Sequence, residues 1–458
     1  MCRTKEEFIK EVSEQIRCKK AVKFVSEELA DHIDGEKEHN VLCGMSEKEA
    51  EYEAVKQMGD PVETGVALDR IHRPKIPVVL LISVAVISIL GILIQFSFTN
   101  STGMENGIFY RQIFYVLIGW AAMTAVLFVD YTFIGKYPAM LWLAVMVLYF
   151  VLEIFSTNVN GIKYFFGGAF DVGYFTAFLF VPIYGGILFS QRKKKFGGFC
   201  LSFAYFAITS VLCAFFRLPA AFIVSLSCFI MLLYAAYENY FDMGRMKTFL
   251  MIAVFSAVVL AGVLLVLFVF APYRAEYFYS RIMYFVNSAQ YAHENGYLRE
   301  VLKSVLSEAK AFQSADVPSK FSGYVQNIYE IIPELQYSYV FTYIIAFFGI
   351  VPAIAVTAVF VVLSVVFVAI SLKQKNKLGR MISFSVSILF ILQTVLYILS
   401  NVAVLPEISK YMPFLSFGGS GIVVNMVLLG IVMSVFRNTN IVKEPSEGKT
   451  VKFKITFE

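Results

Sequence analysis

The chain of 458 residues contains about ten apolar segments, each long enough to cross a lipid bilayer as a helix. The segments are expected at residues 77–97, 112–130, 138–156, 174–190, 199–216, 219–237, 248–271, 338–372, 383–404 and 414–436. The eighth is unusually long for one crossing, so we expect it to tilt, to kink at Pro352 or to project beyond the bilayer. The succession predicts an all-α fold, a polytopic membrane helix bundle of about ten transmembrane helices.

The overall composition supports the same class of protein. Hydrophobic residues make up 58% of the chain and charged residues 16%, with a mean hydropathy of +0.68, which excludes a soluble globular protein of this length. The net charge of +5 comes from clusters of Lys and Arg between apolar segments and does not indicate nucleic-acid binding. The six cysteines form no CxxC pair and the four histidines are scattered, so the residues themselves indicate no metal, cofactor or disulfide framework.

Basic residues between the segments predict how the chain crosses the membrane. Lys and Arg precede the first and seventh segments and follow the fourth and eighth, at residues 70–75, 192–195, 245–247 and 373–380. With ten crossings all four clusters fall on one side, which is expected to be cytoplasmic. Both termini are then cytoplasmic, and the long loop 272–337 is external. We interpret the clusters as topology determinants, with binding of anionic lipid as the alternative.

Residues 1–75 are polar and are expected to form a small cytoplasmic bundle of three or four helices. Apolar residues recur at helical spacing through residues 8–33. Ser46 and Glu49 have the spacing of a capping box that opens a further helix. The Gly-Asp-Pro sequence at 59–61 is expected to end that helix and to begin the next.

Three strings in this segment, at residues 28–33, 44–50 and 54–61, resemble the HAAS or permease-prefix domain. That module precedes membrane segments in many Gram-positive membrane proteins, and the resemblance implies a docking or regulatory role with a cytoplasmic partner that is unknown. We therefore expect a HAAS-like domain at residues 1–75, a transmembrane domain at 76–437 and a cytoplasmic tail at 438–458.

The stretch from Pro413 to Gly421, which reads PFLSFGGSG, is polar and rich in glycine at the start of the last apolar segment. Such a backbone is tolerated at membrane depth only where protein buries it or where it lines a wet cavity, and Ser416 and Ser420 are suited to satisfy its polar groups. Close packing of helices is the simpler interpretation of the small residues. The whole string resembles the signature near the C-terminus of the FtsW/RodA/SpoVE (SEDS) family, membrane glycosyltransferases that polymerise a lipid-linked peptidoglycan precursor.

Other stretches resemble this family in order and spacing across residues 77–437. They are Arg111-Gln112, Asp130-Tyr131, Asn160 to Tyr164, Pro272 to Arg274, Arg281-Ile282, Gly296-Tyr297, Pro333-Glu334 and the run from Gln393 to Leu405-Pro406 and Met412 to Phe414.

The resemblance implies an external cavity in which sugars are linked by displacement of a lipid pyrophosphate. This chemistry needs a carboxylate as base and cations for the leaving group, and the resemblance also allows a divalent cation. The substrate-binding residues that it implies are Arg274, Arg281, Lys163, Gln393, Ser416, Gly418, Gly419 and Ser420. Anchoring to lipid headgroups is an equally weighted interpretation of Arg274 and Arg281.

Several polar elements of the family are absent from this chain. Ser338 stands at the position of the catalytic aspartate, and Arg217 stands where the family has a carboxylate. The stretches 173–176 and 306–312 also lack the family's polar and glycine-rich residues. Glu334, four residues before Ser338, is a candidate substitute base, and the alternative is a charge favoured by a helix N-terminus.

We interpret the chain as a divergent SEDS-like protein of bacterial cell-wall assembly, in division, shape or sporulation. It is expected to bind lipid II or a related polyprenyl-linked precursor, while the missing aspartate calls its polymerase activity into question. The alternatives are an active peptidoglycan glycosyltransferase that uses Glu334 and a transporter or flippase of the precursor. The family implies a class B penicillin-binding protein as partner, and the expected location is the bacterial cytoplasmic membrane.

Overall fold

The computed structural model describes residues 4–74, 76–102, 107–159, 162–165, 170–270, 272–291, 296–318 and 327–439. It divides into two compact units, of which one is Met1–Ile76 with Gln374–Lys377 and Phe436–Glu458, and the other is Pro77–Lys373 with Leu378–Val435. The division into domains 1–75, 76–437 and 438–458 stays a prediction, since the tail from residue 440 lies outside the described residues.

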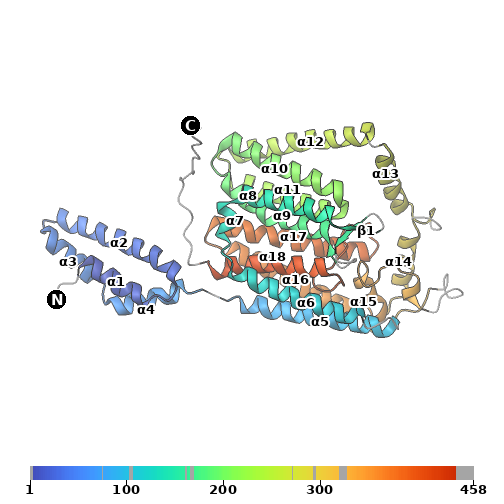
Figure 1. The fold of residues 1–458 in the computed structure, drawn as a ribbon, viewed down its shortest axis with the longest axis horizontal. Coiled ribbons are helices and arrows are strands. Elements are labelled where there is room, and N and C mark those ends of the chain that lie inside the picture. The colour runs from blue at the N-terminus through green and yellow to red at the C-terminus, as the bar shows by residue number, and fades with distance from the viewer. Residues whose placement is uncertain are drawn as a thin grey trace. The chain divides into compact units, whose positions relative to one another are not determined.

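The N-terminal segment forms four helices: α1 Lys5–Gln15, α2 Lys19–Leu42, α3 Glu47–Gln57 and α4 Pro61–His72 (Figure 1). Their apolar faces enclose a core that includes Phe8, Val12, Val25 and Ile33. This core confirms the helical spacing seen in the sequence.

The helix ends of this bundle are fixed by short polar residues. At the start of α3 the backbone N and the Oγ of Ser46 both donate to the Glu49 carboxylate, at 3.3 and 2.7 Å. Asp60 caps α4 by accepting hydrogen bonds from the backbone N–H groups of Val62 and Glu63, at 2.9 and 3.0 Å. The predicted helix boundaries around residues 46 and 60 are therefore confirmed.

The second unit consists of long apolar helices with short elements between them. Its helices are α5 Val78–Thr102, α6 Gly107–Phe128, α7 Thr132–Lys136, α8 Pro138–Ile154, α9 Val172–Ser190, α10 Lys195–Phe216, α11 Leu218–Tyr237, α12 Arg245–Phe270, α13 Pro272–Val286, α14 Tyr297–Ser307, η1 Ile328–Glu330, α15 Val340–Phe348, α16 Ile350–Leu372, α17 Lys377–Asn401 and α18 Gly419–Arg437. Within the described residues, nine helices are long and apolar enough to cross a membrane. The shorter α8 is the tenth crossing that the sequence predicts. The all-α membrane fold is confirmed.

Three helices form the centre of this bundle. The most apolar windows of α9, α18 and α17 are 89%, 78% and 67% buried, whereas that of α12 is only 11% buried. Figure 1 shows α13, α14, α15 and β1 together at one end of the long helices. We call this the loop end, and it also carries residues 402–418, because Ala403 and Lys410 contact α14 and β2 there.

A small antiparallel sheet lies at the loop end, between α8 and α9. It consists of β1 Thr157–Val159, β2 Ile162–Phe165 and β3 Phe170–Asp171, in the order β1-β2-β3. Tyr164 is paired with Asp171 in the register of β2 and β3. Directly opposed residues of a sheet point to the same face, so the sheet places these two side chains side by side.

The eighth apolar segment is broken into α15 and α16 at Gly349, and not at Pro352 as the sequence suggested. Gly349 has a φ of +100°, a conformation that residues with a Cβ rarely adopt. The loop backbone at 310–315 pairs with the backbone groups that the break leaves without helical partners. Ile350 N donates to Lys310 O at 2.9 Å, and Ala315 N donates to Ala346 O at 2.7 Å. The unusual length of this segment therefore reflects a short helix followed by a full crossing.

Replacing Gly349 by alanine should destabilise the protein. The new Cβ would lie 2.5 Å from the carbonyl oxygen of Ala311, and the backbone would keep a left-handed φ, which together should cost about 1–3 kcal/mol or more. Thermal unfolding in detergent measures this cost. Gly262→Ala on α12 is the matched control, since no atom lies within 4 Å of its new Cβ. Equal melting temperatures for the two variants would contradict the account.

Candidate functional site

The glycine-rich stretch at 413–421 begins as irregular backbone, and the last helix starts only at Gly419 rather than near residue 414. Ser416 is buried, and its Oγ accepts a hydrogen bond from the backbone N of Met412 at 2.8 Å. The same hydroxyl donates to Tyr397 Oη at 3.3 Å. The serine thus satisfies backbone at membrane depth, as its place in the sequence predicts.

Side chains of other helices satisfy the rest of this irregular segment. Gln95 of α5 donates to the carbonyl oxygens of Leu415 and Gln336, at 3.2 and 3.3 Å. Gln393 of α17 donates to the carbonyl oxygen of Tyr411 at 3.1 Å and to the hydroxyl of Tyr174. Gln393 is fully buried, so in this structure it supports the backbone and does not face an open cavity.

Gly418 makes room for the ring of Tyr411. Its φ is +147°, and a Cβ at this position would lie 2.9 Å from the Tyr411 ring. Tyr411 is in turn packed edge-to-face on Tyr174 of α9, with the ring centroids 4.9 Å apart. The glycine therefore permits a close contact that fixes the residue next to Lys410.

Lys410 lies at the centre of a cluster of polar side chains at the loop end. Its side chain is only 9% exposed, and Nζ donates to the hydroxyl of Tyr164 at 3.0 Å. The ring centroids of Tyr164, Tyr411 and Tyr337 lie 5.7, 5.8 and 6.0 Å from Nζ. Three aromatic rings at this distance attract an ammonium, so the site holds a buried cation. We call Lys410, Tyr164, Glu334 and Ser338 the Lys410 cluster.

Lys410 remains protonated in this environment. Burial lowers the pKa of Lys410, but the hydrogen bond to Tyr164 and the carboxylate of Glu334 outweigh burial and raise this pKa above its ordinary value of 10.5. A raised pKa in the folded state means that the charge of Lys410 stabilises the fold below about pH 10.5 and that this contribution is lost as the pH rises further. The cluster is thus cationic at Lys410 throughout the neutral range.

The structure brings together the two candidate catalytic residues, Glu334 and Ser338. Residues 331–338 form turns rather than a continuous helix, yet the Oγ of Ser338 donates to Glu334 Oε2 at 3.2 Å. The same carboxylate oxygen lies 3.6 Å from Lys410 Nζ. Glu334 has a φ of +52° and is 53% exposed, whereas Ser338 is buried. A left-handed backbone is costly for glutamate, and such residues cluster at functional sites.

A buried ion pair adjoins the Lys410 cluster. Arg217, between α10 and α11, lies 3.0 Å from the carboxylate of Asp171, which precedes α9. Asp171 is 1% exposed and also caps α9 by accepting a hydrogen bond from Tyr174 N at 3.0 Å. Its own backbone N donates to Ser420 Oγ at 3.2 Å. Arg217 therefore compensates a buried carboxylate, while Ser420 ties the glycine-rich stretch to the sheet.

The remaining predicted residues are not joined to the Lys410 cluster by the contacts described. Lys163 precedes Tyr164 on β2, and since successive side chains of a strand point to opposite faces, it lies on the other face. Gly419 is the first residue of α18. Arg274 and Arg281 belong to α13, and their side chains lie outside the described part of the chain. Their assignment to substrate binding stays a prediction.

The sequence carries signals for two further residues of the site, Lys410 and Asp171. Lys410 is a single lysine between two apolar segments, two residues before the Met412-Pro413 pair. Asp171 directly precedes an apolar run and has the type of a helix N-cap. Neither signal reveals which side chains the residue contacts. The contacts of Lys410, Tyr164 and Glu334, are far from it in the sequence.

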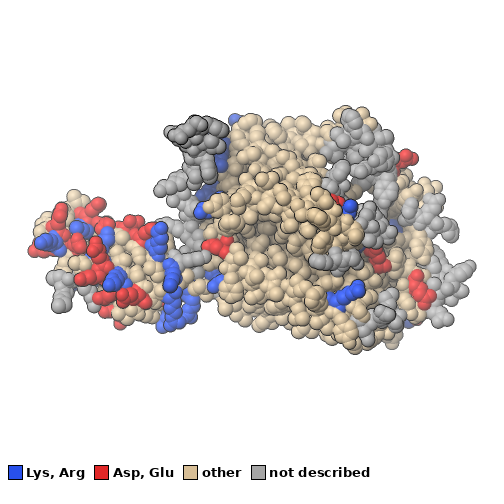
Figure 2. Space-filling view, in the orientation of Figure 1, with Lys and Arg blue, Asp and Glu red and all other residues tan. Residues whose placement is uncertain are grey.

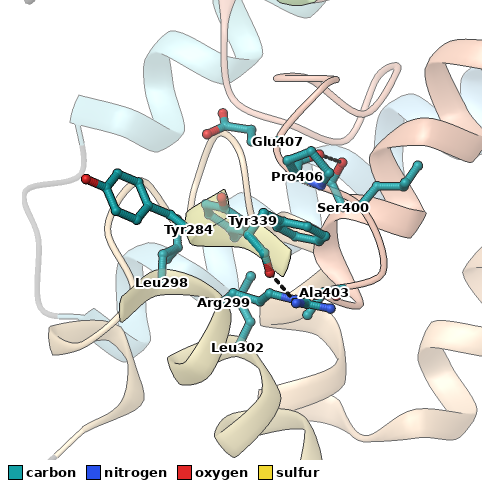
Figure 3. A pocket seen from close by; sticks show the side chains of 11 residues that line it. Tyr284, Leu298, Arg299, Leu302, Tyr339, Ser400, Ala403, Pro406 and Glu407 are labelled. Atoms are coloured by element: carbon teal, nitrogen blue, oxygen red, sulfur yellow. Dashed lines mark hydrogen bonds between the residues drawn. The ribbon is translucent and has the colours of Figure 1, made fainter. Parts of the chain in front are cut away.

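A pocket at the loop end lies between α14 and the turn at 402–407 (Figure 3), and none of the four residues of the Lys410 cluster lines it. Its volume is about 170 Å³, and it opens to the surface. Arg299 Nε donates to the carbonyl oxygen of Ala403 at 3.2 Å, and Ser400 Oγ donates to that of Pro406 at 2.7 Å. These bonds fix the turn that leads to Lys410.

The residues described do not fit a divalent cation held by protein ligands alone. Within these ranges no group of three or more His, Cys, Asp or Glu side chains is arranged to bind a metal. Glu334 is instead engaged by Lys410 and Ser338.

The fold and the cluster define an integral membrane protein of helical type, with polar chemistry gathered at one end of the bundle. The chain belongs to the FtsW/RodA/SpoVE family of cell cycle proteins, whose model matches residues 75–441. The SEDS resemblance seen in the sequence is thereby confirmed.

Relatives and solved structures agree with this family. A probable peptidoglycan glycosyltransferase FtsW of Geobacter metallireducens is 22% identical over 377 residues, which cover 78% of this chain and 93% of that protein. A probable peptidoglycan glycosyltransferase FtsW of Thioalkalivibrio is 32% identical over 113 residues, but this match covers only 24% of this chain and 28% of that protein. A solved structure concerning a peptidoglycan synthase complex, which coordinates polymerization and crosslinking, has the same fold with a TM-score of 0.61 and 17% identity, covering 80% of this chain and 98% of that one.

Replacing Arg217 by methionine should be strongly destabilising. The substitution leaves the carboxylate of Asp171 buried without a cation, which typically costs about 3–5 kcal/mol. The double variant Asp171→Asn with Arg217→Met should recover most of this loss, because it removes both charges and asparagine keeps the cap on α9. Chemical unfolding in detergent measures both variants. A double variant no more stable than Arg217→Met would show that the pair is not coupled.

Proposed function

We propose that this protein takes part in bacterial cell-wall assembly and binds a lipid-linked peptidoglycan precursor, such as lipid II, at the Lys410 cluster. The observation that carries the proposal is the buried ammonium of Lys410 beside an exposed carboxylate that can move away. A lysine ammonium binds phosphate as a point charge, and the precursor carries a pyrophosphate. The Lys410–Glu334 contact is then a resting state in which the glutamate occupies the place of the phosphate.

The charges around the cluster support binding of an anion. Lys410 and Arg217 are cations, and Asp171 compensates Arg217 at 3.0 Å. When the Glu334 side chain turns outward, Lys410 keeps its tyrosine neighbours, but no carboxylate of the cluster remains next to its ammonium. The pyrophosphate of the precursor would take the place of this carboxylate. Because it carries two negative charges rather than one, its attraction to Lys410 is stronger than that of Glu334.

The properties of Ser338 support a protein whose polymerase activity is weak or absent. A serine hydroxyl does not act as a general base, and no histidine lies near it in sequence to activate it. Its hydroxyl is already committed to Glu334. On this proposal the protein serves as a regulator or scaffold that holds the precursor.

An active glycosyltransferase is the second candidate, and the exposure of Glu334 favours it. The acceptor hydroxyl oxygen would form a bond to the anomeric carbon while the bond from that carbon to the pyrophosphate breaks. The hydroxyl proton would pass to Glu334, and the polyprenyl pyrophosphate would leave towards Lys410.

We also propose two protein partners and a location in the cytoplasmic membrane. The fold shared with the peptidoglycan synthase complex supports a class B penicillin-binding protein as partner. The positions of the basic clusters support the cytoplasmic membrane with both termini inside and the loop end outside. The likeness of residues 5–70 to a HAAS domain supports a further cytoplasmic partner, which is unknown.

Replacing Lys410 by methionine should weaken binding of lipid II by about tenfold to a hundredfold, the usual effect of losing one charged hydrogen bond. Lys410→Arg should retain most of the affinity, because it keeps the charge. Binding of fluorescent lipid II to the purified protein in nanodiscs measures the effect. Lys310→Met is the matched control, since Lys310 is also paired with a carboxylate, Asp316, at 2.8 Å. Unchanged affinity in Lys410→Met would remove the basis of the proposal.

Polymerisation of lipid II, followed on gels, separates the two candidates. The binding protein should show little or no polymer, and Ser338→Asp should create or increase it, because a carboxylate returns to the position of the family's base. The active enzyme should form polymer that Glu334→Gln abolishes while lipid II binding persists. Robust polymer in both wild type and Glu334→Gln would contradict both candidates.

A further inference from the structure

The four-helix unit of residues 4–74 has a strongly uneven charge distribution. In Figure 2 blue atoms gather at one end of this unit and red atoms predominate over the rest. The division runs along α2 itself: Lys19 and Lys23 lie in its first turns, and acidic residues follow over the remainder of the helix. These acidic residues are Glu27, Glu28, Asp31, Asp34, Glu36 and Glu38.

Folding brings further cations to the end that begins α2. The backbone N of Arg17 donates to Asp69 Oδ1 at 3.0 Å. The Arg17 guanidinium forms a long ion pair with Asp69, with Nε 3.9 Å from Oδ2, and the Arg17 side chain is still 82% exposed. The rings of Phe24 on α2 and His72 on α4 are 5.8 Å apart, so the end of α4 lies beside the start of α2. We call the exposed residues Arg17, Lys19, Lys23, Arg70 and Arg73 the basic end.

The basic end is not explained by the stability of the unit. Lys19, Lys23, Arg70 and Arg73 make no ion pair with any described residue. The first turn of α2 has no acidic residue and no side-chain cap. Cations at a helix N-terminus are disfavoured by the helix dipole, so Lys19 and Lys23 cost stability where they are.

The role of basic residues in orienting membrane spans does not explain the basic end either. Basic residues orient a membrane protein when they lie within about 15–20 residues of a span. Arg70 and Arg73 meet that condition, but Arg17, Lys19 and Lys23 are far upstream of α5 and reach the basic end only through folding.

We propose that the basic end binds the anionic headgroups of the membrane and holds the N-terminal unit on the bilayer surface. The chain from His72 to Val78 is so short that it confines the end of α4 to within about 20 Å of the start of α5. A dense array of lipid phosphates is therefore always within reach. Ile71 and Ile76 lie at the end of α4 and in the segment that joins it to α5, and they are 53% and 62% exposed. Exposed apolar side chains of this kind are suited to the boundary between lipid headgroups and acyl chains. The acidic remainder of α2 then faces away from the lipid.

The test measures acylation of single lysines by mass spectrometry in the full-length protein. The protein is reconstituted in nanodiscs of phosphatidylcholine alone or with phosphatidylglycerol. Lys19 should react about fivefold or more slowly with the anionic lipid, the change expected for one cation near such a surface, and high salt should remove the difference. Lys48 on α3 is exposed and is the internal control, with the same rate in both lipids.

A variant identifies the residues responsible. Arg17→Gln with Lys23→Gln keeps Lys19 as reporter and should lose most of the protection, whereas Lys48→Gln should keep it. Unchanged reactivity of Lys48 in the first variant shows that the unit is folded. Equal acylation of Lys19 in both lipids would overturn the proposal. Protection of Lys19 by added polyglutamate but not by phosphatidylglycerol would also overturn it, in favour of an acidic protein partner.

Discussion

The structure depends on satisfying an irregular stretch of backbone inside a helical membrane bundle. Residues 409–418 are all buried and lie outside any helix, so each unpaired carbonyl or amide group there would be costly. Gln95 of α5, Gln393 of α17 and Ser416 of the stretch itself supply hydrogen bonds to this backbone. Two of these side chains come from helices that are far apart in the sequence, so the stretch is satisfied only within the assembled bundle.

The same hydrogen bonds also hold Lys410 in place. The stretch is held at Tyr411 and Met412, immediately after Lys410, and its other end is held where Arg299 and Ser400 fix the turn at 403–406. Lys410 is therefore presented to Tyr164 and Glu334 from a rigid support. A cation held in this way loses little entropy when it binds a phosphate, which is the physical basis of the proposed precursor site.

The sequence predicted the crossings well, because long apolar runs have few alternatives to membrane helices. It did not predict the break at Gly349, since a glycine in an apolar run is equally compatible with an unbroken helix, and the left-handed backbone is stabilised by residues 310–315 of a distant loop. The glycine-rich stretch stands out in the sequence, and Ser416 satisfies its backbone as predicted. Ser420 instead accepts a hydrogen bond from the backbone of Asp171 in the sheet. Lys410 and the Asp171–Arg217 pair were missed because ion pairs between distant segments leave no local pattern. Orientation, domain limits and the HAAS-like role stay predictions.

The surroundings of Ser338 bear on whether a member of this family can act as an enzyme. The residue is buried and donates a hydrogen bond to Glu334, which also forms an ion pair with Lys410. The position that the sequence predicts for the family's aspartate therefore has a carboxylate and a cation beside it. A cryo-electron microscopy structure of the protein in nanodiscs with lipid II would show where the pyrophosphate binds. We expect pyrophosphate density in contact with the Lys410 ammonium and a Glu334 side chain turned away from it. If lipid II binds with its pyrophosphate elsewhere and the Lys410–Glu334 contact stays intact, the Lys410 cluster is not the precursor site.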